Sequence, residues 1–383
     1  NNNDNKVLNV PHLRFPEFTE EWEEHALAEY LDFKNGLNPD VKRIGRGLPF
    51  ISVMDILADG TINYDSIRGK VEATEREIEN FSVEKGDILF QRSSETLEDV
   101  GRANVYMDNR TAVYGGFVIR GRKIGDYNPL FFKYLLSTPL ARKRTCRMGA
   151  GAQHFNIGQD GLSKISLCFP LMEEQNKIAR LLSLIDERIA TQNKIIDKLQ
   201  SLIKGLRVCC MQRNGSDNVY LSEIAQIYQP QTISSAELTE DGFLVYGANG
   251  IIGKYKDYNH KTEQICITCR GNTCGMVNYT KPMSWITGNA MVINTDKYQD
   301  KVYKKYLYHY LSAYNFNSII SGSGQPQIVR TPLEKLKITL PTISEQKQKA
   351  MILDKIQDKI DINHNVLNLY ILQKQYLLRQ MFI

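Results

Sequence analysis

Hydrophobic residues recur at alternating steps of four and three along two long stretches of the chain, the pattern that defines the a/d seam of a coiled coil. The first seam comprises Ile178, Leu182, Ile185, Ile189, Gln192, Ile196, Leu199, Ile203 and Leu206. The second, 171 positions later and less regular, comprises Leu353, Ile356, Ile360, Asn363, Leu367, Tyr370, Lys374 and Leu377. We therefore predict two long spacer helices, over residues 171–210 and 343–383.

The start of each long helix is also duplicated. A β-like run ends in Pro170 in the first copy and in Pro341 in the second, and a Glu-Gln pair follows at Glu174 and again at Glu345. Because helix, proline and Glu-Gln pair repeat at one shift, the chain is predicted to contain two copies of one structural plan.

Short β-type runs broken by Gly, Asp and Asn fill the regions before each long helix. One helical pattern interrupts them in each copy, at residues 129–144 and 301–314, and a short helix is expected near residues 26–31. This mixture predicts an α+β fold with two pseudo-repeated globular domains, residues 1–170 and 211–342. The early segments match at a shift of 194 and the late ones at 171, so the first domain carries 23 more residues of loop.

Connectivity predicts how the two helices pair. The first helix leaves the first domain and the second leaves the second domain, so joining their seams requires an antiparallel arrangement. Gln192 and Asn363 hold equivalent seam positions, where polar residues fix register at a cost in stability, and we predict that they meet. About 35 residues at roughly 1.5 Å each span on the order of 50 Å, enough for two half-sites roughly 34 Å apart on B-DNA.

Composition narrows the class of protein. The net charge of +5, from 48 Lys and Arg against 43 Asp and Glu, permits a nucleic-acid partner without requiring one. The polar first residues and the lack of a long apolar run predict a soluble, cytoplasmic protein. Seven scattered cysteines suit free thiols. A zinc site at Cys266, Cys269, Cys274 and His260 is disfavoured, because the first copy has no matching cysteines.

Motifs of the common catalytic sites are missing. The sequence has no phosphate-binding G-x-x-x-x-G-K-[ST] loop, no G-x-G-x-x-G, no H-E-x-x-H and no Asn-Pro-Pro-aromatic run of amino-methyltransferases. The Glu345-Gln346-Lys347 triplet has a spacing found in some nucleases, but it lies where acidic residues favour the start of a helix. We therefore predict no catalytic residues and no metal in this chain.

Candidate DNA-binding residues fall in loops at corresponding places in the two copies. Duplex recognition uses Lys and Arg for phosphates, and Arg, Gln, Asn, Ser and His for base edges. Each residue alone is more readily explained as a solvated surface side chain, but their coincidence in matched loops favours a shared role. The candidates are Lys42, Arg43, Arg46, Gln91, Arg92, Ser93, Ser94, Gln153 and His154 in the first copy, and Lys254, Tyr255, Arg270, Asn272, Gln325 and Gln327 in the second.

These features together resemble the specificity subunit of type I restriction-modification systems. The likeness rests on FPEFTEEWEEHALAEYLDFKNG near the start, on VEKGDILF, on YGANGIIGKY and GSGQPQI in the second copy, and on the duplicated Pro-x-x-x-Glu-Gln helix start. It covers essentially the whole chain, and the order of the segments carries more weight than any one motif.

The resemblance implies a non-catalytic subunit with two target-recognition domains, each reading one half of a split duplex DNA sequence. It also implies assembly with two adenine methyltransferase subunits and with restriction/translocase subunits. S-adenosylmethionine, ATP and Mg²⁺ are then expected on those partners, and no cofactor on this chain. The residues that read particular bases cannot be transferred from the family, whose recognition domains vary.

Two other classes of function are considered. The chain could be a tandem scaffold that binds two copies of a protein without touching DNA, or a stand-alone nuclease or methyltransferase. Salt-dependent binding to duplex DNA separates the first from the DNA-reading class, because phosphate contacts weaken steeply with salt. The missing catalytic motifs argue against the second.

Overall fold

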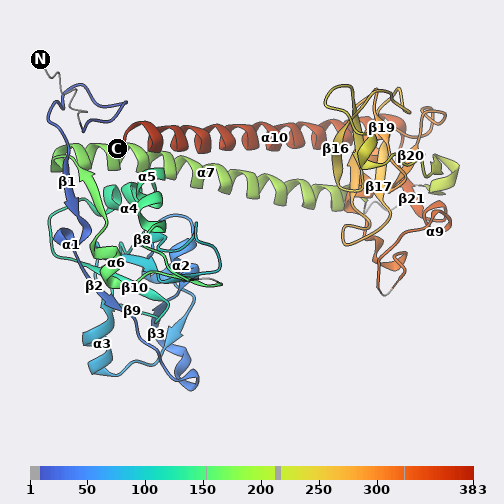
Figure 1. Ribbon diagram of the computed structural model, residues 1–383. Coiled ribbons are helices and arrows are strands. Elements are labelled where there is room, and N and C mark those ends of the chain that lie inside the picture. Colours follow the sequence, from blue (N-terminus) through green and yellow to red (C-terminus); the bar gives the residue numbers. More distant parts are fainter. Residues whose placement is uncertain (1–8, 152, 212–216, 323) are drawn as a thin grey trace, which may run out of the picture. The chain divides into compact units, whose positions relative to one another are not determined.

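The computed structural model describes residues 9–151, 153–211, 217–322 and 324–383 (Figure 1). Contacts divide the chain into two compact units. Unit 1 is formed by the residues up to Gln192 together with Val366–Ile383, and unit 2 by Asn193–Asn365. The long helices α7 (Met172–Met211) and α10 (Ile343–Gln380) each contribute to both units. No helix in the described residues is long and apolar enough to cross a membrane.

The main sheet of unit 1 has four antiparallel strands whose centre is fully buried. A second four-stranded sheet packs beside it, with a parallel pair between β3 and β9. In spatial order the main sheet contains β2 (Leu31–Asn35), β10 (Val118–Lys123), β6 (Ile88–Gln91) and β8 (Ala103–Val105). The second contains β4 (Lys70–Val71), β3 (Ile44–Ile51), β9 (Ala112–Tyr114) and β5 (Ser82–Val83).

Two short strand pairs complete unit 1, β1 with β12 and β7 with β11. The helix predicted over 129–144 is divided, since Pro139 begins a new helix and Thr138 caps it. The helix expected near 26–31 is a single turn. The bounds are β1 (Glu23–Ala26), α1 (Leu27–Tyr30), α2 (Val53–Leu57), α3 (Glu75–Phe81), β7 (Ser93–Ser94), α4 (Pro129–Ser137), α5 (Pro139–Cys146), β11 (Phe155–Asn156), α6 (Gln159–Ser163) and β12 (Ser166–Phe169).

Unit 2 repeats this plan with fewer and shorter insertions. Its main sheet has the order β14, β20, β17, β18, which corresponds strand for strand to β2, β10, β6, β8. The chain is thus α+β with two repeated globular domains, as predicted. The elements are β13 (Asp217–Tyr220), β14 (Gln226–Tyr228), β15 (Phe243–Gly247), β16 (Gly250–Tyr255), β17 (Ile265–Thr268), β18 (Val277–Tyr279), β19 (Trp285–Ile286), β20 (Ala290–Asn294), α8 (Lys304–Ala313), α9 (Arg330–Glu334) and β21 (Lys337–Leu340).

The predicted seam is buried or half-buried in both units, where α7 and α10 run antiparallel. In unit 2, Ile203 packs with Leu353 and Ile360. In unit 1, Leu377 joins the core that contains Ile178, and Lys374 pairs with Asp186 at 2.6 Å. The 3.5-residue period places one apolar stripe of each helix toward its partner, which explains why this pattern predicts a helix pair.

The duplicated Glu-Gln pair has a structural explanation. The buried Gln175 side chain donates from Nε2 to the Pro170 carbonyl at 3.0 Å and accepts the Asn128 backbone N–H at 3.1 Å. Gln346 forms the same pair of bonds, to the Pro341 carbonyl at 2.9 Å and from the Tyr303 N–H at 2.8 Å. Each glutamine therefore ties the start of a long helix to the start of the domain helix beside it.

The chain end closes the core of unit 1. Phe382 stacks on Phe131, with ring centroids 5.4 Å apart, and meets Trp22 edge-on at 6.1 Å. The N-terminal segment covers the same region, since Arg14 forms two hydrogen bonds of 2.8 and 2.7 Å with the buried carboxylate of Glu174. The first and last segments of the chain are thus both part of one unit.

Candidate nucleic-acid interface

The segment after the central strand carries predicted site residues in both units, and a second loop pairs with it. In unit 1, Ser93 and Ser94 form β7 and pair with Asn156 and Phe155 of β11. In unit 2, Arg270 forms a β-bridge with Gln327. Each unit therefore brings together two loops that are separated by more than 50 positions in the sequence.

Backbone hydrogen bonds show that the two loop pairs are equivalent. The N–H of Ile157 donates to the Arg92 carbonyl at 3.0 Å, and that of Ile328 donates to the Cys269 carbonyl at 3.0 Å. Gly101 donates to Gln91 and Gly275 to Thr268, both at 2.9 Å, in the same relation to the central strand. We call these surfaces reading loop 1 (residues 92–94 and 153–156) and reading loop 2 (residues 270–272 and 325–327).

Polar side chains of both reading loops face solvent. Gln153 and His154 are exposed at the tip of reading loop 1, and the Ser93 hydroxyl donates to Asn156 Oδ1 at 2.5 Å. Arg92 is half-buried and donates to the Gly116 carbonyl at 3.3 Å. In reading loop 2 the exposed side chains are Arg270, Asn272, Gln325 and Gln327. Both loops thus present hydrogen-bonding groups of the types that contact base edges and phosphates.

Gln91 differs from the other residues predicted in this region. Its side chain is only 5% exposed, and its Nε2 donates to the Ser93 carbonyl at 2.9 Å. A buried amide cannot reach a ligand on the surface, so in this position Gln91 supports the shape of reading loop 1.

The basic residues near the start of β3 lie beside acidic partners. Lys42 is exposed. Arg43 forms an ion pair with Glu77 and donates from Nε to the Glu72 carbonyl at 2.8 Å. Arg46 pairs with the Glu72 carboxylate at 2.6 Å. The Arg43 guanidinium holds the pKa of Glu77 at about 2, so this carboxylate stays charged and offsets the local positive charge.

Lys254 and Tyr255 lie outside reading loop 2. They are the last two residues of β16. Lys254 lies five residues after the turn that joins β15 to β16, a distance of roughly 16 Å along a strand. Lys254 is 3.5 Å from Asp241, and the Tyr255 ring packs edge-on against Trp285 at 5.0 Å. The structure therefore does not gather these two with the other predicted residues of unit 2.

The two predicted register residues lie in different units. Gln192 is buried in unit 1, and Asn363 in unit 2 donates from Nδ2 to the Lys359 carbonyl of its own helix at 2.5 Å. Their meeting stays a prediction.

Two exposed polar residues, one within reading loop 1 and one beside reading loop 2, were not among the residues predicted from the sequence. Asn156 contacts Ser93, and Asn249, in the turn between β15 and β16, accepts a hydrogen bond from the Thr273 hydroxyl. Asn249 lies in the YGANG segment, whose turn signal was visible in the sequence, but only the folded sheet brings it to reading loop 2.

The cysteine-rich segment of unit 2 is part of the fold rather than the surface. Cys266 and Cys269 are buried, and burial raises the pKa of the Cys266 thiol. His260 Nε2 and the Tyr228 hydroxyl form a hydrogen bond of 2.8 Å. In the described part of the chain, which excludes the side chain of Cys210, no three His, Cys, Asp or Glu residues gather to hold a metal ion.

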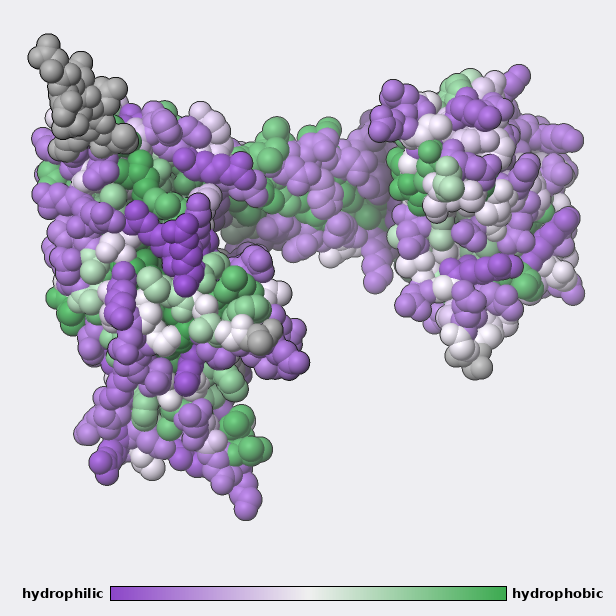
Figure 2. All heavy atoms as spheres, in the orientation of Figure 1, coloured by the Kyte–Doolittle hydropathy of each residue, from purple (hydrophilic) through white to green (hydrophobic). Residues whose placement is uncertain are grey.

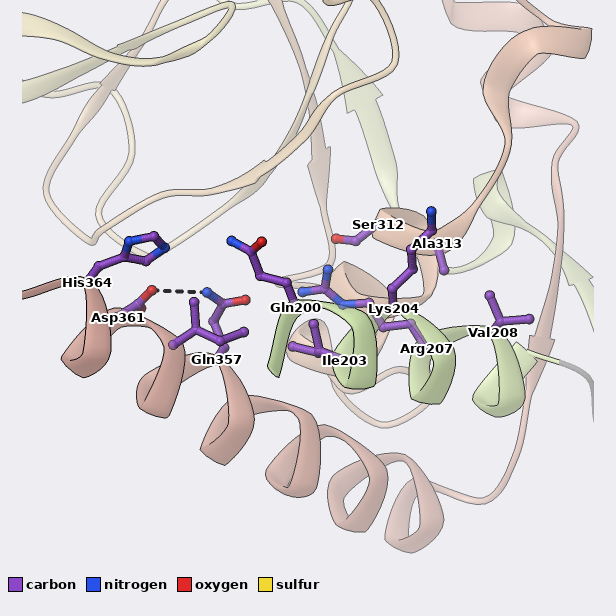
Figure 3. Close-up of a pocket in the computed structure, with 11 residues that line it drawn as sticks. Gln200, Ile203, Lys204, Arg207, Val208, Ser312, Ala313, Gln357, Asp361 and His364 are labelled. Carbon is purple, nitrogen blue, oxygen red and sulfur yellow. Dashed lines mark hydrogen bonds between the residues drawn. The ribbon is translucent and has the colours of Figure 1, made fainter. Parts of the chain in front are cut away.

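A cavity of about 460 Å³ in unit 2 lies among helices and not at reading loop 2. Its lining includes Lys204, Arg207, Asp361 and His364 (Figure 3). The Arg207 Nε donates a hydrogen bond to Nδ1 of the buried His309 at 3.2 Å. The other ring nitrogen of His309, Nε2, lies 3.0 Å from the Asp354 carboxylate. Burial lowers the pKa of His309, and its bond from Arg207 requires an unprotonated Nδ1.

Two matched domains with paired polar loops and long connecting helices define a modular recognition protein. The model of the type I restriction modification DNA specificity domain family matches the chain twice, over residues 19–201 and 214–369. The chain therefore belongs to this family.

Some relatives match most of the chain and others match part of it. The putative type I restriction enzyme MjaX specificity subunit of Methanocaldococcus jannaschii is 25% identical over 399 residues, covering 93% of this chain and 92% of its own length. The EcoprrI specificity subunit of Escherichia coli is 32% identical over 140 residues, covering 35% and 34%. The crystal structure of the type I restriction-modification S subunit from M. genitalium shares the fold, with a TM-score of 0.67, 16% identity, and coverage of 98% and 99%.

Proposed function

We propose that this chain is a non-catalytic DNA-specificity subunit, in which each reading loop recognises one half of a split duplex target. The observation that carries the proposal is the equivalence of the two reading loops. The same backbone hydrogen bonds, from Ile157 to Arg92 and from Ile328 to Cys269, hold different side chains in place in the two units. A constant scaffold with variable exposed side chains is what two different half-sites require.

The long helices would set the unread gap between the half-sites. α7 alone has 40 residues, corresponding to about 60 Å of helix. Adding or removing one helical turn in both helices is expected to change the gap without changing either half-site.

The same helices carry surface that suits protein partners. In unit 1, α10 exposes Leu369, Leu372 and Tyr376 at 65%, 60% and 58%, spaced to lie on one face. In unit 2, α10 exposes Met351 and Ile352. Figure 2 shows hydrophobic side chains among hydrophilic ones on the visible face of the long helices. Exposed apolar residues grouped on one helix face are typical of interaction sites.

We propose that these faces bind two methyltransferase subunits, with restriction/translocase subunits joining the assembly. S-adenosylmethionine, ATP and Mg²⁺ would then be bound by the partners, which would carry out the chemistry. A subunit that acts on the DNA of its own cell would work in the cytoplasm.

Binding to duplex DNA as a function of salt tests the proposal directly. The full chain, assembled with its methyltransferase subunits, is titrated with labelled duplex between 50 and 200 mM salt, a range over which six to ten phosphate contacts lower the affinity by roughly 10³- to 10⁵-fold. Affinity that is absent, or the same at both salt concentrations, would favour the alternative of a tandem protein scaffold.

A domain exchange tests the modular assignment. Replacing residues 220–340 with the second domain of another family member should change one half of the methylated sequence and leave the other unchanged. The matched control exchanges the corresponding first domain and should change the opposite half. A change in both halves after a single exchange would contradict the assignment of one half-site to each domain.

The purified chain alone should show no turnover with S-adenosylmethionine or Mg²⁺ and DNA, which would exclude a stand-alone enzyme.

A further inference from the structure

Two exposed residues outside the predicted site hold equivalent positions beside the reading loops. Phe117 precedes the central strand β10, and Asn289 precedes its counterpart β20. The Phe117 carbonyl accepts the Arg92 N–H at 2.9 Å, and the Asn289 carbonyl accepts the Cys269 N–H at 3.3 Å. The next residues pair in the same register, Val118 with Gln91 and Ala290 with Thr268.

The turn that presents each residue packs closely against a neighbouring loop. In unit 1, a Cβ atom on Gly116 would lie 1.8 Å from Oδ1 of Asn38, so a larger residue there would have to displace the Asn38 side chain. In unit 2, a Cβ atom on Gly288 would lie 2.5 Å from Oγ1 of Thr232. Because the neighbouring loop packs against the backbone of each turn, the following side chain has a fixed starting point, which lowers the entropy cost of a contact.

The surroundings of the two residues differ in chemistry. Phe117 is 69% exposed and borders a cavity of about 410 Å³ whose rim also includes Ile44 and Met54, which is 76% exposed. Asn289 is exposed, and the Gly288 carbonyl beside it accepts a hydrogen bond from Gln229 Nε2 at 3.2 Å. One unit thus offers an apolar surface, and the other an amide, at the same place relative to its reading loop.

A single exposed phenylalanine is ordinary on protein surfaces and needs no explanation by itself. Three observations distinguish Phe117: its carbonyl is hydrogen-bonded to the backbone of reading loop 1, its turn packs closely against the Asn38 side chain, and an exposed residue occupies the matched position in unit 2. The apolar rim is continuous with the candidate DNA interface, so duplex DNA is the occupant that the geometry favours.

We propose that Phe117 and Asn289 are equivalent specificity-determining residues, which contact bases in the two different half-sites. Phe117 would make an apolar contact with the 5-methyl group of a thymine, and Asn289 would donate and accept hydrogen bonds with N7 and N6 of an adenine. Both pairings follow from the groups that each base presents in the major groove. This inference rests on the proposed DNA-reading function.

The test is selection of bound duplexes from a randomised bipartite library by the full chain assembled with its methyltransferase subunits. Phe117→Ala should remove the preference at one thymine position and lower the affinity for the original target roughly three- to ten-fold. Asn289→Ala should remove the preference at one adenine position in the other half-site, with a loss of roughly ten-fold or more. Each variant should leave the opposite half-site unchanged.

Ile124→Ala is the matched control, because Ile124 is 61% exposed and follows the other end of β10. It should leave the selected sequence unchanged. An unchanged selected sequence in Phe117→Ala and Asn289→Ala, relaxation in both half-sites at once, or relaxation at other base pairs would overturn the inference. If wild-type protein selects no bipartite sequence at all, the proposed function itself fails, which separates the two conclusions.

Discussion

Docking of the chain end in unit 1 can be tested by removing one ring. Phe382 is 6% exposed, stacks on Phe131 and meets Trp22 edge-on. Replacing a buried phenylalanine with alanine usually costs about 3–5 kcal/mol, because apolar contacts are lost and a cavity remains. Because the surrounding side chains can partly close over the gap, we expect about 3 kcal/mol for Phe382→Ala, the lower end of that range.

Tryptophan fluorescence can follow unit 1 separately from unit 2. The chain has two tryptophans, the buried Trp22 in unit 1 and the half-buried Trp285 in unit 2. In a Trp285→Phe background, Trp22 alone reports unfolding of unit 1 in urea. For m values of about 1–3 kcal/mol/M, a loss of about 3 kcal/mol lowers the midpoint by about 1 M or more.

The control is Tyr376→Ala, which removes an aromatic ring from α10, six residues before Phe382, at a position that is largely exposed. Exposed substitutions change stability by about 0.5 kcal/mol or less. Equal midpoints for Phe382→Ala and Tyr376→Ala would refute the reasoning, because they would show that the chain end contributes nothing to the core around Trp22.

Three further predictions concern buried polar groups, and urea unfolding monitored by the fluorescence of each unit checks all of them. Arg14→Ala should destabilise unit 1 by about 3 kcal/mol, since it leaves the buried Glu174 carboxylate without its partner, and a loss below about 0.5 kcal/mol would contradict this. Gln175→Ala should cost about 1–3 kcal/mol by leaving buried backbone groups unpaired. Gln175→Glu keeps an acceptor oxygen for the Asn128 N–H but loses the Nε2 donor to the Pro170 carbonyl, so it should also be less stable than the wild type. Because the folded-state pKa of His309 is lowered, wild-type unit 2 should lose stability as pH falls below about 6.5, by at most about 1.4 kcal/mol per pH unit. That loss should shrink in His309→Gln, whose side chain does not titrate beside Arg207, and an identical pH profile would count against the assignment.

The starts of the two long helices carry a pattern that the sequence reveals only in part. The repeated Pro-x-x-x-Glu-Gln pattern showed that a feature was duplicated, but it did not show its purpose. The structure shows that Gln175 and Gln346 each join a proline carbonyl to the first turn of another helix. Hydrogen bonds across about 45 residues depend on the packing of separate elements, so the pattern alone could not reveal them.

At the candidate site, too, the sequence revealed the repeat but not the surroundings of each side chain. The sequence matched Gln91–Ser94 to the segment that begins at Arg270, whereas the backbone hydrogen bonds make Arg92 equivalent to Cys269, so residues 92–94 correspond to 269–271. Gln91, however, is buried under its own loop, and Lys254 with Tyr255 lies at the far end of a strand. Side-chain direction alternates along a strand, so one position decides whether a polar group reaches the surface or supports it.

The sequence by itself determined the twofold plan, the α+β class, the two long helices and their antiparallel pairing, because each is written in local periodicity or in a repeat at constant shift. Only the tertiary structure decided which loops form one surface and that Phe117 and Asn289 occupy the same place in the two units. Those relations arise from hydrogen bonds between strands far apart in the chain, and no local pattern encodes them.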